Sequence, residues 1–491
     1  MSRGQPGELP PGTSEFCARR PPGTPDPDCP LGLESLCEIA SRAGQQSRHG
    51  GDHGQAHTVQ SQLSIPFHHW QPPAIGVPAS AENTTLEAAG ASSNPDGFLD
   101  RAMAASASLR RPGVAARVEA RQTGSPNPKC RPRVAEHSVM SGIFEWSAAS
   151  PESQGMDGTR LEAMQRDLAR RGTKALLVIR HDRVVWEWYA PGFSSGLRHY
   201  TASMAKVLVA GMSLLVVIGD GRMEADDLAW KYIARWRDHP LKSHITIRHL
   251  ATHTSGIEDA EEPGKSFDEL TGWKGAFWWR EGDPDPFTIA LDQAPLLFPP
   301  GTSMAYSSPG MAALGYAITA SLRGGPQTDL HSLLKARVMD PIGVPEDHWR
   351  VGGDPPWELD GLRLYASWGG GQYTARAAAR VGRLMLRRGD WEGEQLIDAD
   401  LADQALSRGG PAPSDHQCTF GLTWWINDGG QWPGLPRDAF AAGGAGHQVL
   451  LIVPSLDLIA VRNGDNLDPE AAFWRPIETQ VFDPLVEAVR D

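Results

Sequence analysis

The longest apolar run in the chain is VLVAGMSLLVVI, from Val207 to Ile218. A helix needs about 20 apolar residues to cross a bilayer, so this run is too short for a membrane span. It suits a helix buried in the core of a sizeable globular domain. We expect this helix to run from Met204 to about Gly219, where the sequence Gly-Asp-Gly offers a C-cap.

The first 139 residues have a different composition from the rest. They contain many of the 40 prolines, PPG repeats and Gly, Ser and Ala, with almost no periodic apolar pattern. Such a segment cannot bury enough apolar surface to offset the entropy of ordering it. We therefore predict a disordered, low-complexity N-terminal arm over residues 1–139 and a folded domain over residues 140–491.

Charge and cysteine content narrow the function classes. Positive and negative residues balance within the arm, so the net charge of −13 belongs to the folded domain. An acidic domain argues against nucleic acid or an anionic membrane as a partner. Four of the five cysteines lie in the arm, and Cys418 lacks the Cys and His neighbours of a zinc site. We find no signal peptide and expect a cytoplasmic protein that needs no metal or cofactor.

Hydrophobic periodicity outlines an α+β fold. An amphipathic helix is expected over about 157–171, followed by a strand hairpin over 175–190 with a polar corner at 181–183. Strand patterns return only late, in FGLTWWI, HQVLLIV and DLIAVRN, and a helical pattern closes the chain. Strands from both ends should join into one antiparallel sheet flanked by the N- and C-terminal helices.

The middle of the folded domain is mostly helical and loop-rich in pattern. We expect it to form a second, helical lobe over about 204–364, inserted into an α/β lobe made of about 146–203 and 365–491. No internal repeat is found.

Two serines in the stretch GFSSGLRHYTASMAK match sequence patterns of catalytic nucleophiles. Ser194 is the centre of a GxSxG pattern, which in α/β-hydrolases lies on a sharp turn between a strand and a helix. Here Pro191 separates GFSSG from the preceding strand pattern, and five residues follow before any helical period begins. We therefore place Ser194 in a loop and do not expect it to be catalytic.

Ser203 belongs instead to an SxxK pattern at the start of the apolar helix. The i, i+3 spacing puts Lys206 on the same helix face, one turn after the serine. A lysine can accept the serine proton only when desolvation keeps it neutral, and the apolar run supplies that environment. The pattern alone is weak, because Ser332 and Lys335 in HSLLK form a second SxxK.

The surroundings of Ser203 resemble a known family. The blocks are YTASMAK, HLATHTSGI, PGTSMAYSSPGMAALGYAI, SWGGGQYTARAAARVGRLML and AAGGAGHQVLLIVP. Their order and spacing resemble the serine β-lactamase and penicillin-binding-protein superfamily, in particular the class C-like branch of esterases, D-aminopeptidases and nylon-oligomer hydrolases. The resemblance covers about Trp146 to the C-terminus. It implies a β-lactamase/transpeptidase-like fold.

The resemblance also implies roles for single residues. Ser203 would be the nucleophile and Lys206 its base, with Tyr306 moving protons to the leaving group and gaining phenolate character beside a charged lysine. Ser308 stands where the family has Asn, which weakens any grip on a β-lactam side chain. Gly444-Ala445-Gly446 would replace the Lys-Thr-Gly block, so its cation is missing. Gly446 would let substrate approach, and the His447 N–H would stabilise the oxyanion together with that of Ser203.

The other candidate site residues are more simply interpreted as structural. His249 and His253 have a metal-binding spacing, but the zincin pattern needs Glu where Leu250 stands. His447 could act as the base of a Ser-His pair, although the family uses only its backbone. Tyr200 is expected to pack rather than react.

Three tryptophans, Trp273, Trp278 and Trp279, lie close together in WKGAFWWREGD and could form a lid over a cleft or belong to the core.

The sequence therefore predicts a serine hydrolase that cleaves a small ester or amide through an acyl-enzyme on Ser203. Without the Lys-Thr-Gly side chains, an efficient β-lactamase is the weaker choice, and D-amino-acid peptidase activity stays an alternative. The rival from another class is a non-catalytic binding or scaffold protein that keeps the fold. Retention of Ser203, Lys206 and Tyr306 argues against that rival. The sequence leaves the oligomeric state open.

Overall fold

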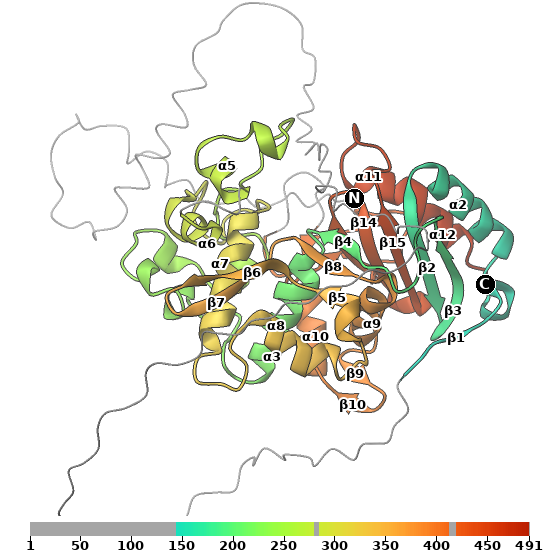
Figure 1. Ribbon diagram of the computed structural model, residues 1–491, viewed down its shortest axis with the longest axis horizontal. Coiled ribbons are helices and arrows are strands. Elements are labelled where there is room, and N and C mark those ends of the chain that lie inside the picture. Colours follow the sequence, from blue (N-terminus) through green and yellow to red (C-terminus); the bar gives the residue numbers. More distant parts are fainter. Residues whose placement is uncertain (1–143, 279–283, 412–418, 491) are drawn as a thin grey trace, which may run out of the picture. The chain divides into compact units, whose positions relative to one another are not determined.

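The computed structural model describes residues 144–278, 284–411 and 419–490 (Figure 1). The predicted arm, residues 1–139, lies outside the described residues, as do Trp279 and Cys418. The described chain enters the fold at Phe144, whose ring lies 4.1 Å from the guanidinium carbon of Arg383. The disordered arm stays a prediction, and the chain is described from Phe144 onward.

One large sheet joins the two ends of the domain, as predicted. Among the described residues it has eight strands in the order β1-β3-β2-β15-β14-β13-β12-β11, antiparallel except for the parallel pair β1 and β3. The pairing of β2 with β15 connects the start of the domain with its end. The strands are β1 (Ser147–Ala148), β2 (Thr173–Arg180), β3 (Arg183–Tyr189), β11 (Thr419–Phe420), β12 (Trp425–Ile426), β13 (Phe440–Gly444), β14 (Gln448–Val453) and β15 (Leu458–Gly464).

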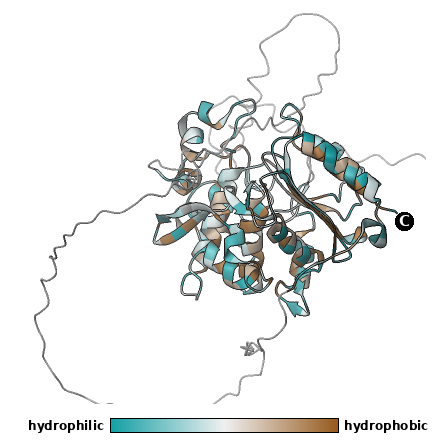
Figure 2. Cartoon of the chain, turned by 45° about the vertical axis from the view of Figure 1, so that its right-hand side comes forward, coloured by the Kyte–Doolittle hydropathy of each residue, from teal (hydrophilic) through white to brown (hydrophobic). Residues whose placement is uncertain are grey.

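Helices cover both faces of this sheet, so its central strands are buried on both sides. Leu176 and Val178 of β2 face an outer core shared with the first and last helices of the domain. Leu177 and Ile179, the alternate residues, face the inner core, which continues into the helical lobe. Figure 2 shows the brown strands nearly edge-on between these layers. The covering helices are α2 (Gly158–Arg170), α11 (Trp474–Ile477), η11 (Glu478–Phe482) and α12 (Asp483–Glu487) outside, and α9 (Ala375–Leu386) inside.

Local sequence explains the ends of these elements. Asp157 caps α2 by accepting hydrogen bonds from the backbone N–H groups of Thr159 and Arg160. The hairpin between β2 and β3 turns at His181 and Asp182, which both have a positive φ, as a tight hairpin turn requires. The predicted helix and hairpin are therefore confirmed to within a few residues.

The helical lobe is built around the predicted apolar helix. That helix begins with a π-helical segment, η2 (Lys206–Gly211), and continues as α3 (Met212–Gly219). Beside it lies α7 (Ser308–Ser321), which is buried along almost its whole length. The lobe also contains α4 (Ile247–Ala251), α5 (Gly272–Trp278), α6 (Pro286–Thr288), η7 (Ile289–Gln293), α8 (Leu330–Leu334) and η8 (Lys335–Met339).

Two features of the middle region were not predicted. A hairpin of β6 (Gly352–Leu359) and β7 (Leu362–Ala366) packs on α7 and extends the lobe slightly past residue 364. A small sheet in the order β4-β8-β5 contains β4 (His199–Ala202), β8 (Gly371–Tyr373) and β5 (Trp349–Arg350). Because β4 ends at Ala202, this sheet holds the residue just before Ser203. The remaining described strands and α-helix are β9 (Asp390–Trp391), β10 (Glu394–Gln395) and α10 (Ala399–Ala405), and short 3-10 turns connect several of the elements.

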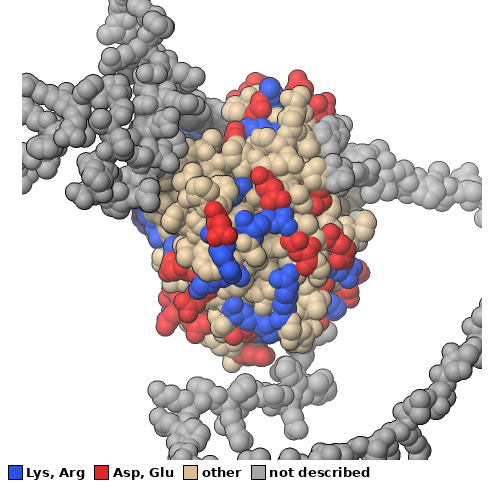
Figure 3. All heavy atoms as spheres, turned by 90° about the vertical axis from the view of Figure 1, so that its left-hand side faces the viewer, with Lys and Arg blue, Asp and Glu red and all other residues tan. Residues whose placement is uncertain are grey.

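Two observations concern membrane-spanning helices and the distribution of surface charge. Within the described residues, no helix has both the length and the apolar character that crossing a membrane requires. Figure 3 shows one face of the molecule, on which Lys and Arg are interspersed with Asp and Glu.

Candidate active site

Ser203 lies on a sharp turn between a strand and a helix. β4 ends at Ala202, which has a φ of 46°, a value that is strained for a residue with a side chain. The turn is closed by the N–H of Met204, which donates to the Thr201 carbonyl over 3.1 Å. Ser203 thus precedes the helix by one turn and is half-buried. The strand–turn–helix arrangement that the GxSxG pattern requires is therefore found at Ser203 and not at Ser194.

Lys206 is buried, with 4% of its surface exposed. Its Nζ donates to Ser203 Oγ over 3.1 Å, to Ser308 Oγ over 3.2 Å and to the Trp368 carbonyl over 2.8 Å. Burial lowers the pKa of Lys206 to about 8, although the nearby carboxylates of Asp259 and Glu261 oppose this change. A good fraction of the amine is therefore neutral near physiological pH, as a base for Ser203 must be.

Tyr306 lies against the lysine through its ring. The Lys206 Nζ is 4.6 Å from the centroid of the ring. Burial raises the pKa of Tyr306 well above 10, although a hydrogen bond with the Ser203 side chain acts in the opposite direction. The direction of this change opposes the phenolate character expected from the sequence and favours the protonated phenol, because burial is its largest cause. The part of Tyr306 in proton transfer stays a prediction.

Ser308 connects the nucleophile to an acidic segment that the sequence analysis missed. It is the first residue of α7, and its N–H donates to Asp259 Oδ1 over 2.8 Å. Burial raises the pKa of Asp259, and it raises that of Glu261 to about 8, with further help from the Asp259 charge. The available signal was the acid-rich sequence IEDAEE directly after the HTSG block.

The end of β13, rather than Gly446, makes the close approach to Ser203. A Cβ added to Gly444 would come within 2.2 Å of the Thr201 carbonyl oxygen and 3.1 Å of the Ser203 nitrogen. A Cβ added to Gly446 would instead meet the Gln448 side chain and the Gly464 carbonyl. Gly444, the last residue of β13, therefore packs against the backbone just before Ser203, and the substrate-approach role of Gly446 stays a prediction.

His447 follows in the turn between β13 and β14, with its ring engaged elsewhere. Its Nδ1 accepts a hydrogen bond from the Leu467 N–H over 3.0 Å, and its ring stacks on Phe473. Burial lowers the pKa of His447 to about 4. The buried Arg462 donates to the carbonyls of Gly446 and His447, which fixes this turn. No contact of the ring with Ser203 supports a Ser-His pair, and the oxyanion role of the His447 N–H stays a prediction.

The other candidates are not brought to this site. Ser194 is exposed, in a loop. The two histidines of the HLATH segment make structural contacts. His249 Nδ1 accepts a hydrogen bond from the Thr246 N–H, and the His253 ring stacks on the Tyr306 ring. Within the described residues, no group of His, Cys, Asp or Glu is arranged to hold a metal ion.

The described tryptophans of the Trp-rich segment pack inward. Trp278 Nε1 donates to the Ala260 carbonyl, beside Asp259. The Phe277 ring, one residue earlier on α5, contacts Trp368, whose carbonyl accepts from Lys206. Helix α5 therefore supports the site from behind, and a lid role for this segment stays a prediction.

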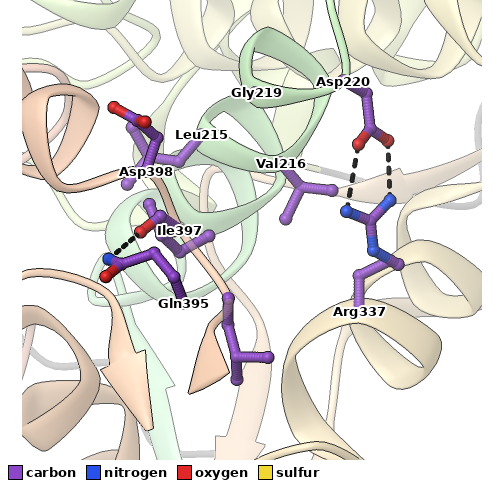
Figure 4. A pocket seen from close by; sticks show the side chains of 9 residues that line it. Leu215, Val216, Gly219, Asp220, Arg337, Gln395, Ile397 and Asp398 are labelled. Atoms are coloured by element: carbon purple, nitrogen blue, oxygen red, sulfur yellow. Dashed lines mark hydrogen bonds and ion pairs between the residues drawn. The ribbon is translucent and has the colours of Figure 1, made fainter. Parts of the chain in front are cut away.

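A cavity of about 250 Å³ lies at the other end of the apolar helix, away from Lys206. Figure 4 shows Asp220 and Arg337 facing each other there through two hydrogen bonds, of 2.7 and 3.0 Å. Leu215 and Val216 of α3 contribute apolar walls. The cavity has no serine, tyrosine or unpaired base, so it does not compete with Ser203 as a catalytic centre.

The site geometry agrees with comparisons to known proteins. The sequence matches the family described as Beta-lactamase over residues 160–475, more than half of the chain. The chain belongs to the beta-lactamase family. This is a family of serine hydrolases, and the matched range includes Ser203, Lys206, Tyr306 and Gly444.

Individual relatives are hydrolases. The 6-aminohexanoate-dimer hydrolase of Paenarthrobacter ureafaciens is 24% identical over 66% of this chain and 80% of its own. Esterase EstB of Burkholderia gladioli is 31% identical over 29% of this chain and 36% of its own. A solved structure, a putative 6-aminohexanoate-dimer hydrolase from Bacillus anthracis, has a TM-score of 0.54 and 18% identity over 70% of this chain and 87% of its own. The predicted α+β, β-lactamase-like fold is thereby confirmed.

Proposed function

We propose that this beta-lactamase family member cleaves a small ester or amide through a covalent acyl-enzyme on Ser203. One observation carries the proposal. The Lys206 amine lies 3.1 Å from Ser203 Oγ in a buried environment that lowers its pKa to about 8. A nucleophile within hydrogen-bond reach of a base whose lowered pKa leaves part of it neutral near physiological pH is the arrangement required for acyl transfer.

The chemistry follows from the positions of the three side chains. Neutral Lys206 accepts the Ser203 proton while Oγ forms a bond to the substrate carbonyl carbon. The negative charge on the carbonyl oxygen is stabilised by the Ser203 N–H and by backbone at the end of β13, beside Gly444. The bond to the leaving group then breaks, and Tyr306, which is protonated, supplies a proton to that group. Water hydrolyses the acyl-enzyme by the reverse sequence, which restores each proton.

Electrostatics favours a substrate without a carboxylate next to the cleaved bond. The strand edge has Gly444 and Ala445 where the family resemblance placed a cation, so these two residues supply no positive side chain to pair with an anion. Asp259 and Glu261 lie near Lys206 and add negative charge there when they are ionised, although burial raises the pKa of both groups. A β-lactam or a C-terminal peptide carboxylate is therefore poorly matched, whereas neutral or amine-bearing esters and amides are compatible. The names of the relatives, an amide hydrolase and an esterase, support the same range of substrates.

A non-catalytic scaffold is the alternative, and it is opposed by the buried lysine. Burying an amine and lowering its pKa is costly for folding, and a binding surface gains nothing from it. One of the three hydrogen bonds of Lys206 also goes to the Ser203 hydroxyl.

Labelling with a fluorophosphonate tests the proposal. We expect the purified protein to gain one adduct on Ser203, found by peptide mass spectrometry, and to hydrolyse p-nitrophenyl esters. Ser203→Ala should lose both properties, and Ser194→Ala should keep both. A fluorescent penicillin and nitrocefin measure the β-lactam alternative in parallel. Absence of any adduct in the folded wild type would favour the scaffold.

A further inference from the structure

His253 occupies an unusual position directly behind Tyr306. It follows α4 by one residue and has a φ of 58°, a left-handed conformation that residues with side chains seldom adopt. Its side chain is almost completely buried, with 1% exposed. The Phe420 ring meets its edge, with centroids 4.6 Å apart and planes at 67°. A strained backbone in a fully packed setting indicates that the surroundings fix this residue in one place.

His253 is bonded to the chain on both sides of Tyr306. Its backbone carbonyl accepts a hydrogen bond from the Ala305 N–H over 2.9 Å. Its Nδ1 accepts a hydrogen bond from the Ser307 N–H over 3.1 Å. The imidazole ring also stacks on the phenol ring of Tyr306, with centroids 4.6 Å apart and an interplanar angle of 30°. One residue therefore fixes the backbone before and after Tyr306 and supports its ring.

The hydrogen bond to Ser307 defines the chemical state of the histidine. Because Nδ1 accepts, it carries no proton, and the neutral ring holds its proton on Nε2. Nε2 is buried and has no hydrogen-bond partner among the described residues. The ring therefore has no proton path to Ser203 through its described contacts, and a catalytic base is excluded by geometry.

The same bond also reaches the start of α7. Ser307 caps that helix by accepting from the Gly310 N–H over 2.8 Å. The next residue, Ser308, accepts from Lys206 Nζ. A change at His253 would thus affect two of the groups that contact the catalytic lysine, Tyr306 and Ser308.

We propose that His253 is a positioning residue that holds Tyr306 in the orientation needed to protonate the leaving group, through its Nδ1 bond to Ser307 and its stacking on the phenol. The proposal rests on the acyl-enzyme function proposed above. It predicts that His253 acts through Tyr306 and that its effect disappears when the phenol hydroxyl is absent.

The test compares a matched ester and amide with the same acyl group. We expect His253→Ala to lower kcat for the amide by about 10²-fold, the scale of a 1 Å misplacement, with little change in KM. The loss on the ester should be smaller, because an alkoxide or phenolate leaving group needs its proton less than an amine does. His253→Asn should restore part of the amide activity, because its side-chain oxygen can accept from Ser307 and Asn tolerates a positive φ.

A second variant separates the two contacts. His253→Phe keeps an aromatic ring behind Tyr306 but removes the acceptor, so it should resemble His253→Ala if the Nδ1 bond dominates. The matched control is His249→Asn, four residues earlier in the same segment, whose Nδ1 also accepts a backbone N–H but which stacks on no active-site residue. That control should leave the amide-to-ester ratio unchanged. Thermal unfolding of each variant checks that it is folded.

A double-variant cycle decides the outcome. In a Tyr306→Phe background, His253→Ala should change the amide-to-ester ratio by less than about twofold, because coupled residues are not additive. Equal losses on ester and amide in both backgrounds would overturn the positioning role and leave only a structural one. Fluorophosphonate labelling of Ser203 in the wild type separates the two proposals. A labelled, active enzyme with an unchanged ratio in His253→Ala refutes the inference alone, whereas an unlabelled wild type refutes the acyl-enzyme function itself.

Discussion

The chain contains the same SxxK pattern twice, and the two copies occupy opposite environments. At the first, the Lys206 amine is buried and donates to the Ser203 hydroxyl over 3.1 Å. At the second, Ser332 donates its hydroxyl proton to the Asp329 carbonyl over 3.0 Å and belongs to a helix cap. Lys335 is bonded to the carboxylate of Asp340 over 2.8 Å, on the surface.

The two lysines differ most in their proton affinity. Burial lowers the pKa of Lys206 to about 8. The hydrogen bond that Lys335 donates to the Asp340 carboxylate raises the pKa of this lysine above its usual value, so it stays charged and cannot act as a base. Helical spacing places both pairs of side chains on one face, but solvent and neighbouring charge decide which lysine can take a proton. The two copies show that an SxxK pattern only indicates a candidate site, and that burial and neighbouring charge decide whether its lysine can act as a base.

Replacing the serine of each SxxK pattern should give the largest difference in activity between the two copies. Ser203→Ala should reduce ester hydrolysis and fluorophosphonate labelling to background, because no other group forms the acyl bond. Ser332→Ala should keep both within about twofold, because surface changes remote from a site are usually small. Turnover of a p-nitrophenyl ester and intact-protein mass spectrometry measure the two effects. A dead Ser332→Ala with an active Ser203→Ala would reverse the assignment.

Removing the two lysines should give the next largest difference. Lys206→Met keeps an unbranched side chain in the buried position but removes the base, and we expect a loss of about 10² to 10⁴-fold in kcat/KM. Lys335→Met should leave kcat/KM nearly unchanged. Pre-steady-state acylation rates show whether the Lys206 loss lies in the step that forms the acyl-enzyme. Retention of wild-type acylation by Lys206→Met would remove it from the role of base.

Substitution of the tyrosine distinguishes leaving groups. Tyr306→Phe keeps the ring beside Lys206 and removes only the hydroxyl. We expect amide turnover to fall by roughly 10²-fold and ester turnover by less, since amines leave only after protonation. A matched ester and amide pair measures the ratio. Equal losses on the two substrates would contradict proton delivery by Tyr306.

The pH dependence follows from the lowered pKa of Lys206. The neutral amine is the base, so acylation should rise about tenfold per pH unit below about 8 and level off above it. The pKa of Tyr306 is raised well above its usual value, so the phenol should add no limb of its own where Lys206 titrates. The pKa of Glu261 is itself raised to about 8, and its ionised form favours the lysine cation, so Glu261→Gln should move the midpoint to lower pH. A midpoint that moves upward would contradict this arrangement.

The smallest effect concerns stability at the second SxxK. Ser332→Ala removes a hydroxyl that accepts from the Asp329 N–H and completes the cap of α8. Loss of such a cap typically costs about 0.5 to 1 kcal/mol. Urea unfolding should show a lower midpoint with unchanged activity. An unchanged midpoint would show that the Asp329 side chain alone sustains the cap.

Much of the fold could be predicted from local pattern. The hairpin around His181, the N-terminal helix and the buried apolar helix have strong periodicity, and the structure contains all three. The hairpin of β6 and β7 was missed because WELDGLRLYA alternates only briefly, inside a region rich in helical and loop signals. The π-helical start of the apolar helix was also missed, because a helical period does not distinguish the two hydrogen-bonding patterns.

The sequence by itself determined which residue types stand in the ordered blocks, and therefore the choice of Ser203 over Ser194 and the pairing with Lys206 and Tyr306. Only the tertiary structure decided the rest. It brought Asp259 and Glu261 next to the lysine, placed Gly444 rather than Gly446 against the nucleophile, and buried Tyr306 so that its phenol stays protonated. The physical reason is that solvation and charge at a site depend on residues distant in the chain, which local spacing does not encode.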